Sequence, residues 1–343
     1  MKKKIYKYFN QFKFSNSISF NKNIFLKINK ETIFSSRRYN FGKKNPKKIF
    51  YVIKRSPGAG LFSNFIFVLK NINYALSKNY IPIVDMKNFP TKYNQIKNIN
   101  NIENVWEIYF DQISNYNLPE VYKSKNVIIC SNNFPVSLKD FRNKNLKKVF
   151  EKKIKIKKKI KMETNKFYKK HFFNNNNVIG IHIRGTDQKI TPGHHLPPTI
   201  FDIISIIEKK LKLNNKFKFF IITEEKKYLD ILKKKYKKKI FYFDSFRANS
   251  IEDFNKSKRS FHRNKLGLES LKEAIIFSYC KEIIFCNSNI PLFSILLNNK
   301  IKIKKELFHG INSKNQILAY YKWYLTVLPI SFLKYLMFKL KSI

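Results

Sequence analysis

Two patterns of hydrophobic and polar positions alternate along the chain, and together they predict an α/β protein. Short apolar runs bounded by polar residues or glycine are typical of buried parallel strands, whereas apolar residues three and four positions apart indicate helices. Strands are expected at 48–53, 81–85, 127–130, 178–183, 217–222, 240–243 and 282–286. Helices are expected at 61–77, 138–173, 200–211, 227–237, 267–279 and 290–297. Strands that alternate with helices in this way favour parallel sheets covered by helices.

The same pattern divides the chain into five segments. Two Rossmann-like domains are expected at 48–150 and 177–310, and a chain of 343 residues has room for both. Residues 1–47 are rich in Lys and Asn and are interpreted as a basic extension without a signal peptide. Residues 151–176 form a basic helical connector, and 311–343 form an amphipathic tail.

The tail is apolar and aromatic, with lysines interspersed. Its longest uninterrupted apolar stretch is too short for a bilayer, which requires about 20 residues. One interpretation is a helix on an anionic membrane surface, with aromatic rings at headgroup depth and lysines on lipid phosphates. The other interpretation is a helix folded back onto the first domain.

The charge of the chain is extreme, because 70 Lys and Arg residues oppose 22 Asp and Glu residues and leave a net charge of +48. Such a field attracts nucleic acid, anionic lipid or phosphorylated substrates. Lys, Asn, Ile, Phe and Tyr are all abundant, however, as in proteins from AT-rich genomes, so most lysines are interpreted as solvated surface. Cys130, Cys280 and Cys286 are too few and too poorly spaced for a disulfide framework or a zinc site, which favours a reducing compartment.

Candidate chemistry gathers where the strand 178–183 ends in a polar turn. Ligands of open α/β sheets bind beyond the carboxyl ends of the strands, so Arg184 is expected at the mouth of a crevice with His182 beside it. Arginine is scarce in this chain, and its planar guanidinium binds phosphate bidentately. Four of the eight arginines lie in one stretch, at Arg184, Arg247, Arg259 and Arg263. The alternative interpretation of the turn is an ordinary charged loop.

Two further turns precede helices and offer backbone N–H groups to an anion. The first contains Gly58 and Gly60, whose G-x-G spacing alone is weak evidence for a dinucleotide site, and the second contains Ser288 and Asn289. No D-x-D pair occurs in the sequence, so a metal-carried nucleotide sugar is not indicated. Arg184 and backbone donors would instead stabilise a leaving diphosphate. Glu273 is either a reader of a base edge together with His182 or an ordinary surface carboxylate.

The peptide HIRGTD, from His182 to Asp187, resembles the H-x-R-R-T-D peptide of GDP-fucose-dependent fucosyltransferases. This superfamily comprises the α-1,6, nodulation and protein O-fucosyltransferase types. FFIITEE, FDSFRAN and LGLESLKEAIIFSYCKEIIFCNSN follow in the family's order, and VIKRSPGAGLFSNF resembles the start of the first domain in related proteins. The resemblance covers roughly Lys48 to Asn299. It implies a GT-B fold of two Rossmann-like domains that face a central cleft, with an acceptor-side first domain and a GDP-sugar-binding second domain.

The resemblance also assigns roles to residues of the donor site. Arg184 matches the arginine that holds the β-phosphate, and His182 and Glu273 fall where the family contacts guanine. Ser288 and Asn289 match the turn at the diphosphate, with Gly58 and Gly60 facing it from the first domain. The second arginine of the family motif is replaced by Gly185, so its role is either lost or supplied by Lys189 or Arg247.

The catalytic base and the partners are the least determined expectations. The family's acidic base candidate aligns near Pro192, which leaves His194, His195 or Asp187 to accept the proton of the acceptor hydroxyl. We expect an inverting fucosyltransferase that needs neither metal nor other cofactor, with GDP-fucose or a related GDP-sugar as donor and a lipid-linked or polysaccharide glycan as acceptor. It is expected in the cytoplasm or on the inner face of a membrane, without a nucleic-acid partner. The alternative is a polyanion-binding protein on a catalytically degenerate transferase scaffold.

Overall fold

The computed structural model describes residues 21–94, 103–173, 177–185, 187–248, 257–286, 288–304 and 309–340. The chain forms two compact units. The first contains the described residues of Met1–Met162 together with Ser260–Leu268, and the second contains those of Glu163–Arg259 and Glu269–Ile343. The α/β class predicted from the sequence is confirmed, because each unit is built around a sheet with parallel strands.

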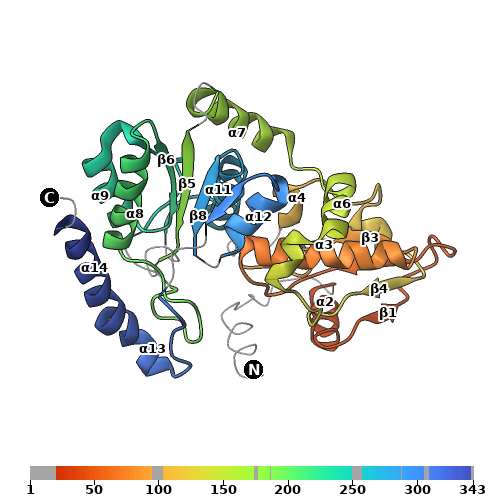
Figure 1. Cartoon of the computed structure of the whole chain (residues 1–343). Helices are drawn as coiled ribbons and strands as arrows, with labels where there is room; N and C mark the ends of the chain where they lie inside the picture. The colour runs from red at the N-terminus through yellow and green to blue at the C-terminus, as the bar shows by residue number, and fades with distance from the viewer. Residues whose placement is uncertain are drawn as a thin grey trace. The chain divides into compact units, whose positions relative to one another are not determined.

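The sheet of the second unit is parallel throughout and has the order β7-β6-β5-β8-β9 (Figure 1). Its strands are β5 (Val178–Ile183), β6 (Lys218–Thr223), β7 (Ile240–Phe241), β8 (Glu282–Phe285) and β9 (Lys302–Lys304). The chain builds outward from β5 to β7 and then returns to place β8 on the other side of β5. In a doubly wound sheet of this order, the direction of winding reverses between these two strands.

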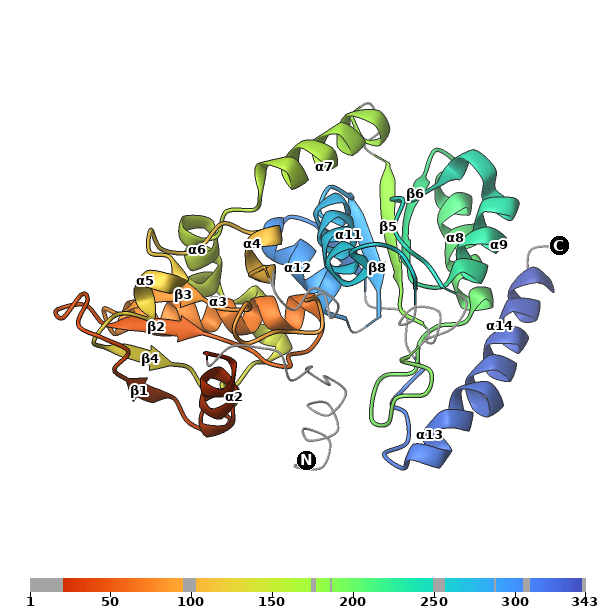
Figure 2. The ribbon, with the colours of Figure 1, turned by 180° about the vertical axis from the view of Figure 1, so that it is seen from behind.

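Helices cover both faces of this sheet, which explains why all six residues of β5 are buried. Both ribbon views place α8 (Ile200–Leu213) and α9 (Lys226–Tyr236) on one face, and α11 (His262–Phe277) and α12 (Asn289–Leu297) on the other (Figures 1 and 2). The short helix η3 (Lys237–Lys239) connects α9 to β7. Gly180 lets α11 approach the sheet, because a Cβ atom there would collide with the Phe277 ring and lie 2.9 Å from Cys280 Sγ.

The sheet of the first unit has the order β1-β4-β2-β3. Its strands are β1 (Arg37–Tyr39), β2 (Phe50–Ile53), β3 (Ile81–Val84) and β4 (Val127–Ile129), and only β1 runs antiparallel to its neighbour. Side chains alternate across β2, as the strand period requires. Phe50 and Val52 join the core cluster that contains Ile28 of α2 (Asn21–Glu31), whereas the Tyr51 hydroxyl donates a hydrogen bond to Asn71 of α3 (Leu61–Ser77).

Shorter helices complete the first unit. They are α4 (Val105–Tyr109), α5 (Leu118–Val121), η2 (Leu138–Arg142) and α6 (Lys144–Lys153), followed by α7 (Lys158–His171), which continues into the second unit. Trp106 of α4 is buried against the rings of Phe65 and Phe110, as expected for a core tryptophan. The sequence pattern predicts one long helix over 138–173, but the structure divides it into three, with a break at Ile154.

The predicted segments differ from the structure in several places, and the predicted second domain 177–310 contains Ser260–Leu268, which belong to the first unit. The predicted extension 1–47 contains α2 and β1 among its described residues, and both belong to the first unit through the Ile28 core contact and the pairing of β1 with β4. The predicted connector 151–176 is not separate either, because the boundary between the units falls within α7 at Met162. Lysine-rich composition concealed both assignments, since a few apolar positions suffice to anchor a solvated helix.

From Gln316 onward the described part of the tail is helical, as α13 (Gln316–Lys322), a π-helical turn η4 (Trp323–Val327) and α14 (Leu328–Leu340). It packs against α8 of the second unit, so the expected alternative of a helix folded onto the first domain is wrong. Trp323 donates its indole N–H to the Pro197 carbonyl at 2.8 Å, and Ser331 donates to Asp202 of α8 at 2.6 Å. Within the described residues, no helix combines the length and apolarity needed to cross a membrane.

Candidate functional site

The candidate site lies where β5 and β8 end, at the reversal of winding in the second unit. His182 pairs in register with Ile222 of β6 and with Phe285 of β8, so the residues that follow these three strands emerge at the same edge of the sheet. They are Arg184, Glu224 and Ser288. Ligands of doubly wound sheets bind at this reversal, because the connections diverge there and leave a crevice.

Arg184 is held by two carboxylates. Its Nη2 atom lies 3.0 Å from Asp187 Oδ1 and 3.1 Å from Oδ2, and its Nε atom lies 3.8 Å from Glu224 Oε1. About a third of the guanidinium-bearing side chain remains exposed. Partly exposed ion pairs of this kind are weak and exchangeable, so an incoming anion can replace either carboxylate.

Gly185 replaces an arginine of the resembled motif, and the structure gives a steric reason for the glycine. A Cβ atom at this position would lie 2.7 Å from Glu225 Cγ and closer still to the carboxylate. Glu225 in turn forms an ion pair with Lys189 at 2.6 Å, and both side chains are almost buried. Lys189 is therefore engaged with the same carboxylate that a Cβ atom at position 185 would meet.

His182 is a neutral histidine inside the sheet. Its side chain is only 2% exposed, and burial together with the neighbouring Arg184 charge lowers its pKa to about 3. Among the described residues, its Nδ1 atom has no hydrogen-bond partner. A buried polar atom without a partner is rare in native proteins, because its desolvation costs about 1–3 kcal/mol. His182 thus offers one ring nitrogen to a ligand at the edge of the strand.

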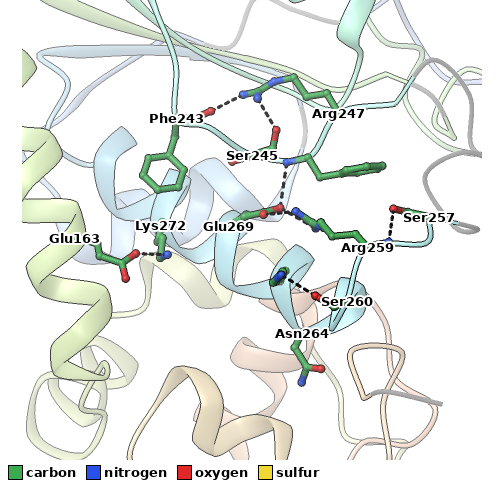
Figure 3. Close-up of polar contacts among 12 residues, drawn as sticks. Glu163, Phe243, Ser245, Arg247, Ser257, Arg259, Ser260, Asn264, Glu269 and Lys272 are labelled. Atoms are coloured by element: carbon green, nitrogen blue, oxygen red, sulfur yellow. Dashed lines mark hydrogen bonds and ion pairs between the residues drawn. The ribbon is translucent and has the colours of Figure 1, made fainter. Parts of the chain in front are cut away.

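Arg247 and Glu273 form a buried ion pair at 3.3 Å, far from the surface position that one interpretation gave Glu273. Arg247 also donates to the carbonyls of Ser245 at 2.7 Å and Phe243 at 3.0 Å, as Figure 3 shows. Burial raises the pKa of Glu273 to about 7, although Arg247 opposes the shift. Glu224 lies within electrostatic reach of both Glu273 and His182, which places these groups around one carboxylate.

A second arginine pair supports the loop that carries Arg247. The Arg259 guanidinium binds the two carboxylate oxygens of Glu269 on α11, and Glu269 also accepts the backbone N–H of Phe246 at 3.1 Å (Figure 3). On the same helix, Lys272 pairs with Glu163. Arg259 is consequently a structural residue of this loop in the structure.

Ser288 and Asn289 stand at the start of α12, directly after β8. Ser288 is the N-cap residue, but its side chain makes no capping hydrogen bond, so the first turn of the helix keeps N–H groups for another partner. Arg184 is close by, because its backbone N–H and its charge both act on the thiol of Cys286, whose pKa burial raises to about 11. The structure thus places Arg184 next to the end of β8, which leads into α12.

Gly58 and Gly60 belong to the first unit, and two N–H groups of their turn have partners within that unit. Asn64 accepts the Ala59 N–H at 2.8 Å, and the Tyr93 hydroxyl accepts the Leu61 N–H at 2.8 Å. Gly58 is required by its φ of +75°, whereas a side chain at Gly60 would meet no atom within 4 Å. The shape of this turn is therefore stabilised by contacts within the first unit.

His194 and His195 lie on a loop that pairs with residues 309–313. The His194 carbonyl accepts the Asn312 N–H at 2.7 Å, and His195 forms an antiparallel bridge with Ile311. His194 is exposed, and Asp187 begins the same loop, since its carbonyl accepts the Thr191 hydroxyl at 2.6 Å. Both histidines thus contact, through their backbone, the segment that leads into the tail.

Sequence reasoning missed two site carboxylates, Glu224 and Glu225. Their signal was their position at the carboxyl end of β6, beside β5, but the neighbour of β5 is known only once the strand order is known. No group of three or more His, Cys, Asp or Glu side chains that could hold a metal occurs among the residues the structure describes.

Comparisons with known proteins identify the fold. No protein-family model and no curated protein matches the sequence. Among solved structures, NodZ α-1,6-fucosyltransferase soaked with GDP-fucose superposes with a TM-score of 0.50 and 14% identity, over 77% of this chain and 99% of that one. A mutant of Arabidopsis thaliana FUT1 in complex with GDP superposes with a TM-score of 0.42 and 12% identity, over 88% of this chain and 78% of that one. POFUT1 in complex with GDP superposes with a TM-score of 0.34 and 11% identity, over 76% of this chain and 75% of that one.

The NodZ structure identifies the fold, because the match covers nearly the whole length of the NodZ chain. The chain is an α/β protein with the GT-B fold of that fucosyltransferase. At 14% identity the likeness establishes the fold alone, so the chemistry has to be argued from the site.

Proposed function

We propose that this protein is an inverting glycosyltransferase that transfers fucose from GDP-fucose to a hydroxyl of a glycan, without a metal ion. The observation that carries the proposal is Arg184 at the reversal point of the second sheet, a partly exposed guanidinium that contacts Asp187 and Glu224 and lies near the start of α12. NodZ, which has the same fold, was soaked with GDP-fucose. The site offers groups suited to each part of such a donor.

The diphosphate would bind Arg184 and the N–H groups at the start of α12. Its negative charge would displace Asp187 from the guanidinium, because an arginine–phosphate contact is bidentate and charge-assisted. The guanine base would be read by the unpartnered Nδ1 of His182 and by the carboxylate of Glu273, which Arg247 holds in place. A carboxylate in a buried site suits the N–H donors on the edge of guanine.

In the transfer, the acceptor oxygen attacks the anomeric carbon of fucose from the face opposite the leaving diphosphate. The bond from that carbon to the β-phosphate oxygen breaks with its electron pair, and GDP leaves with the added charge. Arg184 and the helix N-terminus would stabilise that charge, which is the main catalytic term expected of such donors. The acceptor proton would pass to Asp187, freed from Arg184, or to His194 or His195 on the same loop.

Calorimetric titration of GDP, GDP-fucose and GDP-mannose with a chelator present tests the proposal. Wild-type protein should bind GDP with a Kd of about 1–100 µM, and Arg184→Ala should weaken binding about 10- to 100-fold. Arg184→Lys should fall between them, because lysine keeps the charge without the fork. Arg37→Ala, an exposed arginine of β1, is the matched control and should bind as wild type. Binding that ignores Arg184, or that disappears with the chelator, would contradict the proposal.

The lysine-rich surface favours one alternative, a polyanion-binding protein on an inactive transferase scaffold. Exposed lysines occur on α6, α7 and α9. This alternative predicts affinity for nucleic acid that falls steeply with salt and does not depend on Arg184. Release of fucose to an acceptor, or hydrolysis of GDP-fucose that Arg184→Ala abolishes, would exclude it.

A further inference from the structure

The tail presents an apolar face that the rest of the protein does not cover. Its contacts with the second unit follow one stripe of residues four positions apart, Ala319, Trp323, Val327 and Ser331, all buried. Trp323 and Val327 pack on Leu196, and Ser331 bonds to Asp202. Both ribbon views show α13 and α14 as one rod, with α14 beside α8 (Figures 1 and 2).

The open sides of this rod are apolar and aromatic. Ile317, Leu318, Tyr321, Tyr324, Leu325 and Leu333 are all exposed, Leu325 to 71% and Leu318 to 62%. Exposed apolar surface of this extent is unusual on a soluble protein and marks an interaction site. Since the helical run Gln316–Leu340 has 25 residues, it would extend roughly 37 Å at about 1.5 Å per residue.

The charge around this face selects the partner. No Asp or Glu follows Glu306, whereas Lys314, Lys322, Lys334, Lys339 and Lys341 lie along the tail. A second copy of the chain would bring the same lysines and a net charge of +48 against them, so self-association is electrostatically opposed. Anionic headgroups complement the lysines, and tyrosine is favoured at headgroup depth beside apolar side chains that enter the acyl region.

We propose that the helical run Gln316–Leu340 docks the protein on the surface of a bilayer that contains anionic lipids. The rod lies in the plane of the interface, with the stripe through Trp323 and Val327 toward the protein and Leu318, Tyr321 and Leu325 toward the lipid. Lysines beside these residues bind lipid phosphates. This surface is independent of the proposed donor site, so vesicle binding and GDP binding are expected to fail separately.

The segment just before the rod contacts the loop that carries His194 and His195. Asn312, just before α13, donates its side-chain N–H groups to the carbonyls of Lys189 and Thr191 at 3.2 and 3.3 Å and to that of Ala319 at 3.1 Å. The Lys189 ammonium also lies 4.5 Å from the centre of the Trp323 ring. Docking therefore holds the loop of His194 and His195 at the end of the rod.

Flotation of the full chain with vesicles tests the proposal. Wild-type protein should float with phosphatidylcholine vesicles that contain about 30 mol% phosphatidylserine, weakly with phosphatidylcholine alone, and less at high salt. Leu318→Glu/Leu325→Glu should weaken vesicle binding by about tenfold or more, because both carboxylates oppose the apolar and the ionic contributions. Arg184→Ala should float as wild type.

The matched control is Met162→Glu, which places the same carboxylate at an exposed apolar residue of the lysine-rich helix α7. It should float as wild type. Equal loss in Met162→Glu would assign the binding to the lysine runs and overturn the proposal, as would wild-type protein that stays unbound at low salt. Light scattering that shows a dimer in wild type and a monomer in the double variant, without lipid binding, would assign the face to a second copy.

A gain-of-signal measurement avoids dependence on variants that fail to fold. An environment-sensitive fluorophore on Leu325→Cys should shift to the blue with anionic vesicles, while the same fluorophore on Met162→Cys should not. Cys130, Cys280 and Cys286 are buried, so labelling is selective for the introduced thiol. An unshifted Leu325→Cys signal with protein that floats would place the contact elsewhere.

Discussion

The two units present polar turns at the carboxyl ends of similar parallel sheets, yet the turns differ in how their polar groups are satisfied. In the first unit, the Gly58–Gly60 turn uses Asn64 and Tyr93, and the buried ammonium of Lys54 binds the amide oxygens of Asn29 and Asn132 at 2.8 and 3.1 Å. These partners are all neutral, and Asn29 and Asn64 are buried. In the second unit, Arg184 is held by carboxylates that are partly exposed.

This difference indicates which of the two turns can exchange its present partners for an anionic ligand at the lower free-energy cost. Displacing the partners of the first turn would leave buried neutral groups without hydrogen bonds, which costs about 1–3 kcal/mol each. Displacing Asp187 from Arg184 exchanges one exposed anion for another at little cost. This difference supports the proposal that the donor binds to the second unit.

The largest expected effect is on the free energy of unfolding, and it compares one glycine from each unit. Gly180→Val should lower the free energy of unfolding by about 3 kcal/mol or more, because its side chain would collide with Phe277 and Cys280. Gly60→Val is the matched variant and should change it by less than about 1 kcal/mol, because nothing lies within 4 Å. Denaturant unfolding measures both. Equal loss at the two positions would show that the turn at Gly60 is also tightly constrained.

Lys54 provides the next effect, which depends on pH. Burial lowers the pKa of Lys54 from 10.5 to about 8, so between these pH values the unfolded chain binds the proton and the folded chain does not. Stability due to this group is therefore present above pH 10.5 and is lost as pH falls through 8, by roughly 3 kcal/mol. Lys54→Met should remove this slope. The difference in unfolding free energy between the two proteins, measured from pH 7.5 to 10.5, checks it, and parallel curves would refute the assignment.

Much of the fold followed from the hydrophobic pattern, because strand and helix periods depend on local sequence alone. The run 178–183 and its polar end correctly placed His182 and Arg184 at the carboxyl end of a buried strand. The pattern did not reveal the antiparallel strand Arg37–Tyr39, whose residues are mostly exposed and charged. It also missed the break at Ile154, since lysine-rich helices carry few apolar positions to mark their ends.

The pairing of charges could not be predicted, because it depends on contacts between distant segments. Arg247 and Glu273 are 26 residues apart, and Glu273 is buried only because α11 packs against the sheet. The 309–313 segment reaches the loop of His194 across more than a hundred residues. Local sequence shows which residues are chemically able, whereas strand order and helix packing decide which of them meet.

An arginine introduced at position 185, as in the resembled motif, tests whether Glu225 excludes a side chain from that position. Gly185→Arg should lower the free energy of unfolding by about 2 kcal/mol and should not strengthen GDP binding, because Glu225 occupies the space. Adding Glu225→Ala should recover most of the stability by removing the collision. Thermal or denaturant unfolding of the single and double variants gives the coupling. Independent, additive effects would mean that the two side chains do not compete.

Glu273 should make GDP binding depend on pH. Because burial raises its pKa to about 7, the protonated form stabilises the fold below the unfolded value of 4.5, and this contribution is lost as pH rises through 7. The carboxylate that would read guanine forms over the same range, so GDP affinity should rise about tenfold from pH 6 to 8. Glu273→Gln should bind more weakly and lose this dependence. His182, whose pKa is about 3, stays neutral throughout and cannot produce it.

The smallest expected effect separates the site from the lysine surface. Lys166 and Lys169 are exposed on α7, and Lys166→Glu/Lys169→Glu changes the net charge by four without touching Arg184. At about 0.15 M salt the Debye length is about 8 Å, so distant surface charges are screened and GDP affinity should stay within about twofold of wild type. Calorimetry of this variant beside Arg184→Ala makes the comparison. A loss as large as that of Arg184→Ala would mean that GDP binds through the general positive field, and the preference for the second unit would have no basis in its site.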